Sequence, residues 1–208
     1  MCEYEFRNGE RCKEEALPNS KYCILHIDLP EDEEGEEFKR INKLKEEKVI
    51  EKENKGDFNF EGVKLFEFFF YHTKKVEGGV NFADTVIRSG WFWFKGAIIE
   101  GKASFEGATI EAPLFFNKAT IKGDAIFEGV TIEAPLEFRS ATIKGDAMFN
   151  RAIIKSSAWF EGAVIEGEAS FEGATIVGGV WFKGATIKGS TPLDGFIKKN
   201  QLCLKEQH

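Results

Sequence analysis

Large apolar residues recur along most of this chain at alternating intervals of five and six residues. One series, at spacing 11, consists of Phe94, Phe105, Phe116, Phe127, Phe138, Phe149, Phe160, Phe171 and Phe182. The other consists of Ile99, Ile110, Ile121, Ile132, Ile143, Ile154, Ile165, Ile176 and Ile187. An alanine stands two residues before most of these centres. Side chains two residues apart lie on the same face of an extended strand. Each unit therefore predicts a short strand with one large and one small inward side chain.

Glycines two residues after many centres, such as Gly107 and Gly162, permit a corner after each strand. An apolar period of eleven residues also fits a right-handed coiled coil. However, glycines inside helices would cost about 1 kcal/mol each, and the surrounding Ile, Val, Thr and Phe residues prefer strands. The pattern therefore favours β-structure.

Closer resemblances recur at twice this distance, because residues 110–114 (Ile-Glu-Ala-Pro-Leu) return as residues 132–136. Two units of eleven residues form four short sides, so the sequence predicts one coil per 22 residues. We predict an all-β solenoid, a quadrilateral parallel β-helix of about six coils between Phe60 and Leu193. Buried side chains worth about 1.5–3 kcal/mol each would stabilise its interior without a cofactor.

Units such as Ala103-Ser104-Phe105-Glu106-Gly107 resemble those of the pentapeptide-repeat family, in which a small residue precedes Leu or Phe at the inward positions. The resemblance covers about residues 60–193 and implies a right-handed quadrilateral β-helix. Some members of that family imitate duplex DNA and bind type II topoisomerases. The resemblance therefore adds one alternative function, a DNA-mimic inhibitor or regulator of a topoisomerase.

Before Phe94 the inward pattern continues backwards if one extra residue is allowed near residues 89–91. The expected inward residues there are Ile87, Phe82, Val76, Tyr71, Leu65 and Phe60. The segment 66–71 (Phe-Glu-Phe-Phe-Phe-Tyr) strongly favours a strand and would aggregate if it were exposed. We therefore expect another part of the chain to cover this end.

Residues 34–54 are rich in Glu and Lys, and apolar residues recur there at spacings near three and six. Those residues are Phe38, Ile41, Leu44 and Ile50. This pattern predicts a helix with one narrow apolar stripe, which would form the cover. At the other end, Phe196, Ile197, Leu202 and Leu204 are expected to close the last coil, with Cys203 as a buried thiol.

The head of the chain contains Cys2, Cys12, Cys23 and His26 in the spacing C-x9-C-x10-C-x2-H. Four such ligands suit tetrahedral zinc, and so short a segment could not otherwise bury a core. The alternatives are unrelated reduced cysteines or a disulfide, which an odd number of cysteines in the head disfavours. We predict one structural zinc ion held by these four residues.

This spacing and the amino-acid sequence of residues 11–26 resemble the WRC-type zinc module of plant transcription regulators. The resemblance implies the same four ligands and a role in DNA binding. Here, however, acidic residues including Asp28, Glu31 and Asp32 follow the histidine, and a run of carboxylates repels phosphate. We therefore expect the head to stabilise the fold or to dock on a protein, with nucleic-acid binding through the head as an alternative.

The predicted organisation has four parts: a zinc-binding head (residues 1–30), a charged helical connector (31–57), the β-helix (58–193) and a C-terminal cap or tail (194–208). The formal net charge is -7, but residues 57–193 contain 17 acidic and 14 basic residues, so DNA mimicry and binding to nucleic acid are both weakly supported. No long uncharged apolar run or secretory leader is visible, so we expect a cytoplasmic protein without a membrane partner.

An enzyme needs a clustered base, nucleophile or open metal position. The repeat region contains His72 as its one histidine, and a Cys3His set leaves no position on zinc for water. We therefore predict a non-enzymatic scaffold or protein-binding module. Large side chains one residue before every second Phe should point outward on one side, and Trp93, Phe115, Trp159 and Trp181 are the predicted contacts for a protein partner or a second copy of the chain.

Overall fold

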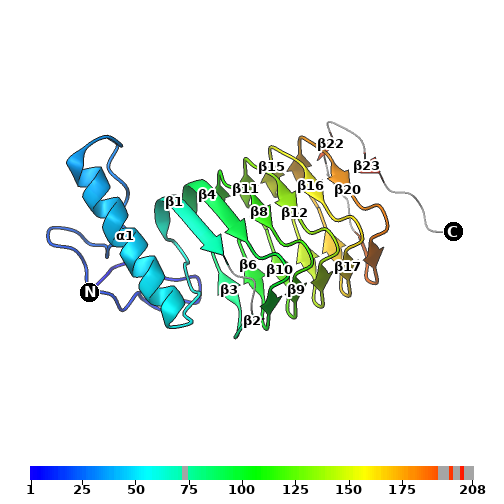
Figure 1. The fold of residues 1–208 in the computed structure, drawn as a ribbon, viewed down its shortest axis with the longest axis horizontal. Helices are drawn as coiled ribbons and strands as arrows, with labels where there is room; N and C mark the ends of the chain where they lie inside the picture. Colours follow the sequence, from blue (N-terminus) through cyan, green and yellow to red (C-terminus); the bar gives the residue numbers. More distant parts are fainter. Residues whose placement is uncertain (72–74, 192–196, 199–201, 204–208) are drawn as a thin grey trace.

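The structure is a computed structural model that describes residues 1–71, 75–191, 197–198 and 202–203. The chain begins with an irregular head, continues into helix α1 (Glu36–Asn54) and then winds into a stack of short strands. Figure 1 shows α1 at one end of this stack and successive coils progressing toward the C-terminus. No helix in the described residues is long and apolar enough to cross a membrane.

The strands form four columns, one for each side of the coil. The first column contains β3 (Val80–Asn81), β6 (Ala103–Ser104), β10 (Ala125–Ile126), β14 (Ala147–Met148) and β18 (Ala169–Ser170). The second contains β7 (Thr109–Ile110), β11 (Thr131–Ile132), β15 (Ile153–Ile154), β19 (Thr175–Ile176) and β22 (Ile197–Lys198). The third contains β8 (Leu114–Phe115), β12 (Leu136–Glu137), β16 (Ala158–Trp159), β20 (Val180–Trp181) and β23 (Leu202–Cys203). The fourth contains β2 (Lys75–Val76), β5 (Ile98–Ile99), β9 (Thr120–Ile121), β13 (Thr142–Ile143), β17 (Val164–Ile165) and β21 (Thr186–Ile187).

Neighbouring strands within a column are parallel, and each strand pairs with the equivalent strand of the next coil. Ala125 pairs with Ala147, and Ile132 pairs with Ile154. In both pairs the partners are separated by two of the repeat units recognised in the sequence. This register confirms the predicted parallel β-solenoid, in which two repeat units make one coil and about six coils are stacked. Its right-handed winding stays a prediction.

Two longer strands, β1 (Lys64–Tyr71) and β4 (Val86–Trp93), each span the second and third columns. Ile87 pairs with Ile110, whereas Phe92 pairs with Leu114. The partners of the first pair are one position further apart in the chain than those of the second. The extra residue predicted near residues 89–91 is therefore present. It lies beside Gly90, whose φ of 109° is in the region that favours glycine.

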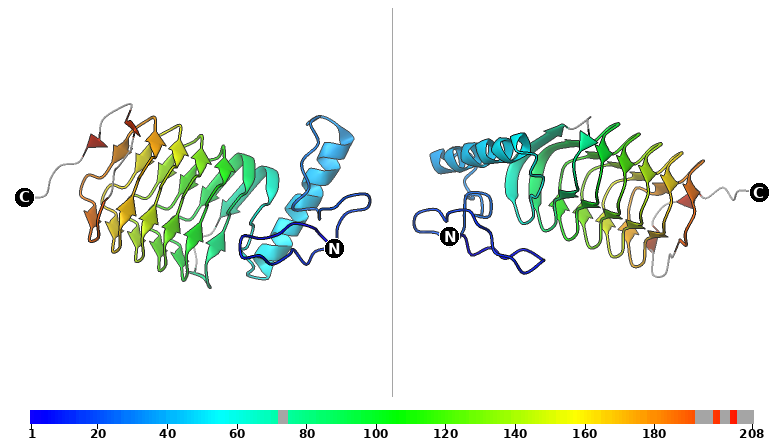
Figure 2. Two further views of the ribbon diagram at one scale, coloured as in Figure 1. Left: turned by 180° about the vertical axis from the view of Figure 1, so that it is seen from behind. Right: turned by 90° about the horizontal axis from the view of Figure 1, so that it is seen from below.

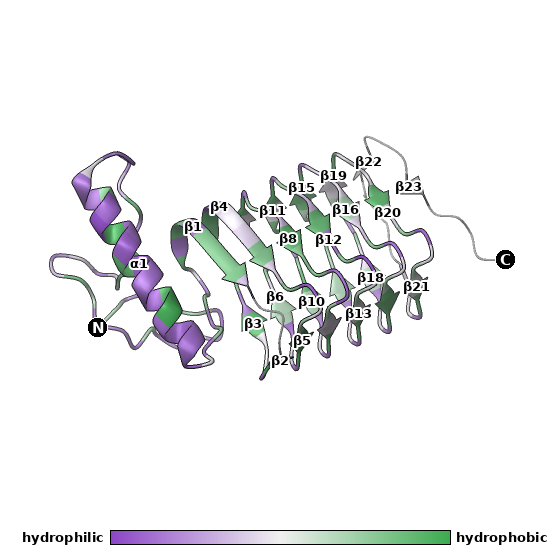
Figure 3. Cartoon of the chain, in the orientation of Figure 1, coloured by the Kyte–Doolittle hydropathy of each residue, from purple (hydrophilic) through white to green (hydrophobic). Residues whose placement is uncertain are grey.

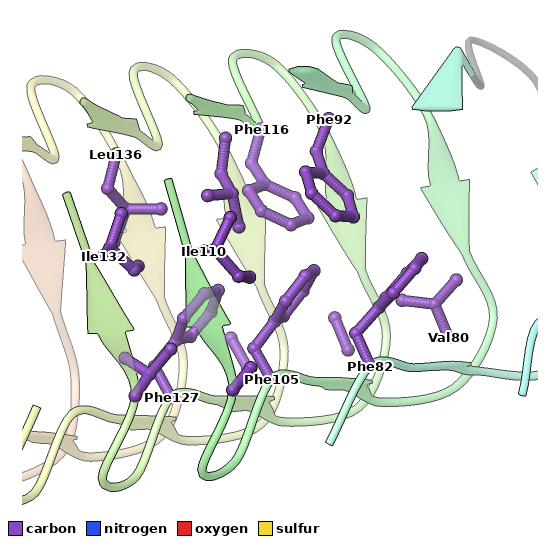
Figure 4. Close-up of a cluster of buried hydrophobic side chains, with 14 of the residues drawn as sticks. Val80, Phe82, Phe92, Phe105, Ile110, Phe116, Phe127, Ile132 and Leu136 are labelled. Atoms are coloured by element: carbon purple, nitrogen blue, oxygen red, sulfur yellow. The ribbon is translucent and has the colours of Figure 1, made fainter. Parts of the chain in front are cut away.

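The phenylalanines of the repeat form two stacked columns in the interior. Phe105, Phe127 and Phe149 stack with ring centroids 4.9 and 5.0 Å apart. Phe116 and Phe138 stack at 4.7 Å in the second column, and Phe127 meets Phe138 edge to face at 5.7 Å. Figure 4 shows Phe82, Phe105 and Phe127 projecting into the space between the strands. Offset stacking and edge-to-face contacts are the favoured aromatic geometries, so the two columns pack against each other as well as along the rod.

The position two residues after many interior Phe residues adopts the left-handed conformation, as at Gly107 (φ 67°). Lys118, Ser140 and Arg151 adopt the same conformation without being glycines, with φ between 54° and 59°. The corner is therefore imposed by the packed coil, because residues other than Gly, Asn and Asp rarely adopt this conformation by themselves.

One inward residue was assigned wrongly from the sequence. Tyr71 is 66% exposed, whereas Phe70 is completely buried. The reason is that β1 carries the same extra residue as β4, so Phe70 pairs with Phe92 and Tyr71 with Trp93. The inward series in the first coil is thus displaced by one position.

Helix α1 covers the N-terminal end of the solenoid, as Figure 2 shows from two sides. Phe38 and Ile41 are buried as predicted, and the ring of Phe38 meets that of Phe66 on β1 at 5.1 Å. Ile50, also expected in the apolar stripe, is 56% exposed, and Val49 is buried in its place. Figure 3 shows α1 as mostly hydrophilic with isolated hydrophobic positions, which is the pattern of a helix with a narrow apolar stripe. The helix therefore covers part of a strand that would otherwise be open to other chains, while Phe69 and Tyr71 of β1 stay exposed.

At the C-terminal end, β22 and β23 pair with β19 and β20. Phe196 and Leu204, two of the residues expected to close the last coil, lie outside the described residues, as does the side chain of Cys203. Ile187 is only half-buried there, unlike the inner members of its series.

Candidate metal centre and aromatic face

The four residues of the predicted zinc motif lie together in the head. The side-chain sulfur atoms of Cys2, Cys12 and Cys23 and a ring nitrogen of His26 all lie within 4.8 Å of one another, and all four residues are buried. Backbone hydrogen bonds hold the segments in place: the Cys2 amide donates to the Glu14 carbonyl, and the Cys12 amide donates to the Tyr4 carbonyl. Cys23 and His26 lie in one turn, in which the His26 amide donates to the Cys23 carbonyl at 3.1 Å.

The distances among these atoms fit a tetrahedral metal ion. Metal–sulfur bonds of about 2.3 Å and metal–nitrogen bonds of about 2.0–2.1 Å place ligand atoms about 3.6–3.8 Å apart. Cys12 Sγ lies 3.9 Å from Cys23 Sγ, and His26 Nδ1 lies 3.5 Å from Cys2 Sγ and 3.2 Å from Cys23 Sγ. The Cys23 amide also donates to Cys2 Sγ at 3.2 Å, which holds this sulfur atom in place. The Cys3His cluster could therefore bind a metal ion.

The imidazole of His26 is held with Nδ1 facing the sulfur atoms. Its Nε2 lies 3.0 Å from the carbonyl oxygen of Glu61, so Nε2–H donates and Nδ1 keeps its lone pair. The ring of Tyr4 stacks on the imidazole with centroids 4.0 Å apart. Burial lowers the pKa of His26 to about 4, so the ring is neutral at pH 7, as a metal ligand must be.

The pKa values of two cysteine thiols are shifted in the opposite direction. Burial raises the pKa of Cys12 to about 12 and also raises the pKa of Cys23. Negative sulfur atoms in this environment therefore need a positive charge beside them. A divalent ion would supply that charge and would deprotonate the thiols as it bound.

The head is attached directly to the solenoid. Arg7 forms an ion pair with Asp84 (Nε–Oδ2 2.6 Å) and another with Glu106, which lies one coil further along. Asp28 pairs with Lys64 on β1, and Glu33 pairs with Arg88 on β4. Some of the acidic residues that follow the Cys3His motif therefore contact the solenoid.

Lys45 connects α1 to the same region. Its side chain is completely buried, and its Nζ donates to the carbonyl oxygens of Leu25 (3.1 Å) and Ile27 (2.7 Å) on either side of His26. Burial lowers the pKa of Lys45 to about 7, and the sulfur of Cys23 acts in the opposite direction. Helix α1 and the turn that carries His26 are thus fixed to each other.

The four aromatic residues predicted as partner contacts lie in the third column, on β4, β8, β16 and β20. Trp93 contacts Phe115 with ring centroids 5.3 Å apart, and Trp159 stacks on Trp181 at 5.4 Å. Glu137 separates the two pairs. All four side chains are half-buried, because each covers its neighbours along the column.

The more exposed aromatic residues of this face had not been predicted. Phe69 is 49% exposed, Trp91 is 46% exposed, and their ring centroids lie 4.5 Å apart. Tyr71 stacks on Trp93 at 6.1 Å. The sequence contained a signal for these pairs, because Phe69 and Trp91 are one coil length apart in the chain, as are Tyr71 and Trp93. We call Phe69, Tyr71, Trp91, Trp93, Phe115, Trp159 and Trp181 the aromatic face.

A family model described as pentapeptide repeats (9 copies) matches residues 94–142, 116–164 and 149–195. The repeats within residues 94–195 therefore belong to the pentapeptide-repeat family. No curated protein and no solved structure matches the chain. The fold and this match are consistent with a structural or protein-binding module.

Proposed function

We propose that the protein is a non-enzymatic scaffold that binds a partner protein through the aromatic face. The observation that carries this proposal is the column of outward aromatic residues, which begins with exposed Phe69, Tyr71 and Trp91. Tryptophan and tyrosine dominate the binding energy of many protein interfaces, and a solenoid presents them on a rigid surface. The ordering cost of binding is small for such pre-organised side chains.

Arg139 supports the same interpretation. Its guanidinium lies 4.8 Å from the ring centroid of Trp159 and forms ion pairs with Glu137 and Glu161. These contacts fix the orientation of Trp159 on its outward side. Aromatic residues and arginine are both enriched in protein interfaces.

The test is affinity capture with matched variants. Replacing Trp159 and Trp181 with serine should leave the fold intact, because both side chains point away from the core, and should abolish association with the partner. Ile153→Ser is the control, because Ile153 is equally outward but lies on the second column. The proposal is wrong if the tryptophan variant and the control capture the same proteins in the same amounts.

We infer that the ion in the head is zinc and that its role is structural. Four protein ligands complete a tetrahedral shell, which leaves no position for a reacting water. The purified chain should contain one zinc ion, and Cys12→Ser should lose it, whereas Cys203→Ser, which changes the cysteine outside the head, should retain it. Metal analysis that finds equal zinc in both variants would refute this assignment.

The surface charges do not favour the DNA-mimic alternative. Residues of opposite charge stack across successive coils, as in Lys122–Glu100 (2.7 Å), Lys155–Glu133 (2.5 Å) and Lys188–Glu166 (3.6 Å). A surface that imitates the DNA backbone would need acidic residues without this compensation.

A further inference from the structure

A groove separates α1 from β1 at the beginning of the aromatic face. It has a volume of about 270 Å³, and its lining is Glu46, Val49, Ile50, Glu53, Leu65, Glu67, Phe68 and Phe69. Five of these eight residues are apolar, and one of them, Ile50, is 56% exposed. Ligand pockets for whole small molecules usually measure about 300–1,000 Å³. This groove is therefore suited to a single long side chain.

The charges around the groove have one sign. Three of its lining residues are glutamates, two from α1 and one from β1, and the lining contains no lysine, arginine or histidine among the described residues. Such a surface attracts a cation that also has an apolar stem.

Glu53 is the lining residue whose missing hydrogen bond favours a ligand. Its Oε1 is buried and has no hydrogen-bond donor among the described residues. Burial raises the pKa of Glu53 to about 7, because nothing in the groove compensates its negative charge. A buried acceptor without a donor costs about 1–3 kcal/mol, and more when it is charged. A donor that entered the groove would therefore bind favourably once the Glu53 carboxylate turned Oε1 toward it.

Phe69 adds a second contact for such a donor. Its ring lines the groove and also contacts Trp91, so the groove and the aromatic face form one surface. A guanidinium group can stack on an aromatic ring while it donates two parallel hydrogen bonds to a carboxylate, which an ammonium cannot do equally well. Arginine therefore fits these residues better than lysine.

We propose that this groove binds an arginine side chain of the partner protein, with its guanidinium paired to Glu53 and stacked on Phe69. This proposal rests on the proposed function, since it describes which chemical group the partner places at the N-terminal end of the aromatic face. The partner segment would carry apolar residues beside the arginine, which would cover Ile50 and Trp91.

The test uses two probe peptides, acetyl-Leu-Arg-Leu-amide and the same tripeptide with citrulline in place of arginine. Citrulline keeps the shape of arginine but has no charge. Binding is followed by the backbone amide shifts of the ¹⁵N-labelled full-length protein. The arginine peptide should shift the amides of residues 46–53 and 65–69 in a saturable manner, and the citrulline peptide should bind at least about tenfold more weakly, since hydrogen bonds to charged groups are the stronger ones.

Variants separate the groove from the rest of the protein. Glu53→Gln should reduce affinity for the arginine peptide at least about tenfold, and Phe69→Ala should reduce it several-fold. Glu47→Gln is the matched control, because Glu47 is exposed on α1 and does not line the groove. Equal binding of the two peptides, shifts that lie elsewhere, no binding, or an unchanged affinity in Glu53→Gln would each overturn the proposal.

The experiments distinguish failure of the groove proposal from failure of the proposed function. The Trp159→Ser/Trp181→Ser variant should bind the arginine peptide as the unmodified protein does, because both residues are distant in the column from the groove. If partner capture is unaffected by that variant while the peptide result holds, the proposed function fails and the arginine groove stands.

Discussion

Replacing Phe127 with alanine tests how strongly the stacked phenylalanines hold successive coils together. Phe127 is completely buried, and its ring lies between those of Phe105 and Phe149 at 4.9 and 5.0 Å. Phe116 and Phe138 meet it edge to face at 6.2 and 5.7 Å. Alanine would remove all four ring contacts and leave a cavity bounded by strands whose register is fixed.

The expected loss is large because such a cavity cannot collapse. Phe→Ala substitutions in protein cores cost about 3–5 kcal/mol, and we expect a value near the upper end. Phe182 provides the comparison: it is 8% exposed, and its described ring contacts are one stacked neighbour, Phe160, and one edge contact, Phe171. Phe182→Ala should therefore cost about half as much, roughly 2 kcal/mol.

The assay is unfolding in guanidinium chloride followed by both circular dichroism and tryptophan fluorescence. The tryptophans lie near the two ends of the rod, Trp91 and Trp93 on β4 and Trp159 and Trp181 on later coils. In a solenoid each coil contacts only its neighbours, so a central cavity should let the two ends unfold at different denaturant concentrations. A loss below about 1 kcal/mol for Phe127→Ala, or an equal loss for Phe182→Ala, would refute the reasoning.

Three further predictions concern the first coils, helix α1 and the head. Gly90→Ala should lower the melting temperature far more than Gly96→Ala. A Cβ at Gly90 would lie 1.9 Å from the Phe68 carbonyl oxygen, whereas a Cβ at Gly96 would meet nothing within 4 Å. Equal melting temperatures of the two variants would contradict this. Glu53→Gln should raise the melting temperature at pH 8 but not near pH 4. The pKa of Glu53 is raised by burial from 4.5 to about 7, so the folded state binds this proton more tightly than the unfolded state and stability falls as pH rises through that range. A gain that is the same at both pH values would show that Glu53 is not the titrating group. Chelation of the metal should accelerate hydrogen exchange at the amides of Cys2 and Lys64, which donate to the carbonyls of Glu14 and Leu25. Interior amides of later coils should stay protected. Equally accelerated exchange along the whole chain would contradict a local role for the metal.

The interior of the solenoid could be predicted from the sequence because inward and outward positions alternate locally. Each short repeat unit predicts a strand with two inward residues and a corner after it, and this unit recurs along the chain. The extra residue near Gly90 was also visible, since it interrupts the period. Its copy in β1 was not, because the segment before Phe82 contains phenylalanines at both inward and outward positions and no repeat on its N-terminal side to fix the register.

The clustering of Cys2, Cys12, Cys23 and His26 could be predicted, but the attachment of this cluster to the solenoid could not. Ligand types and short spacings identify the Cys3His set between Cys2 and His26. By contrast, the pairing of Arg7 with Asp84 joins residues 77 positions apart, and the hydrogen bond from His26 to Glu61 joins residues 35 positions apart. Neither pair has a spacing that distinguishes it from any other pair of polar residues in the chain.

Helix α1 connects the Cys3His cluster to the groove between α1 and β1. One side of the helix carries Lys45, which holds the turn of His26 through the carbonyls of Leu25 and Ile27. The residues Val49 and Glu53, one and two helical turns further along, line the groove. The head also contacts the solenoid through Arg7 and Glu61, so the metal centre, the helix and β1 are fixed to one another. The position of α1, and with it the separation of Glu53 from Phe69, therefore depends on the head, a short segment that a metal ion at the Cys3His cluster would stabilise. A structural metal ion in this protein would then act on partner binding at a distance, by holding one wall of the groove in place.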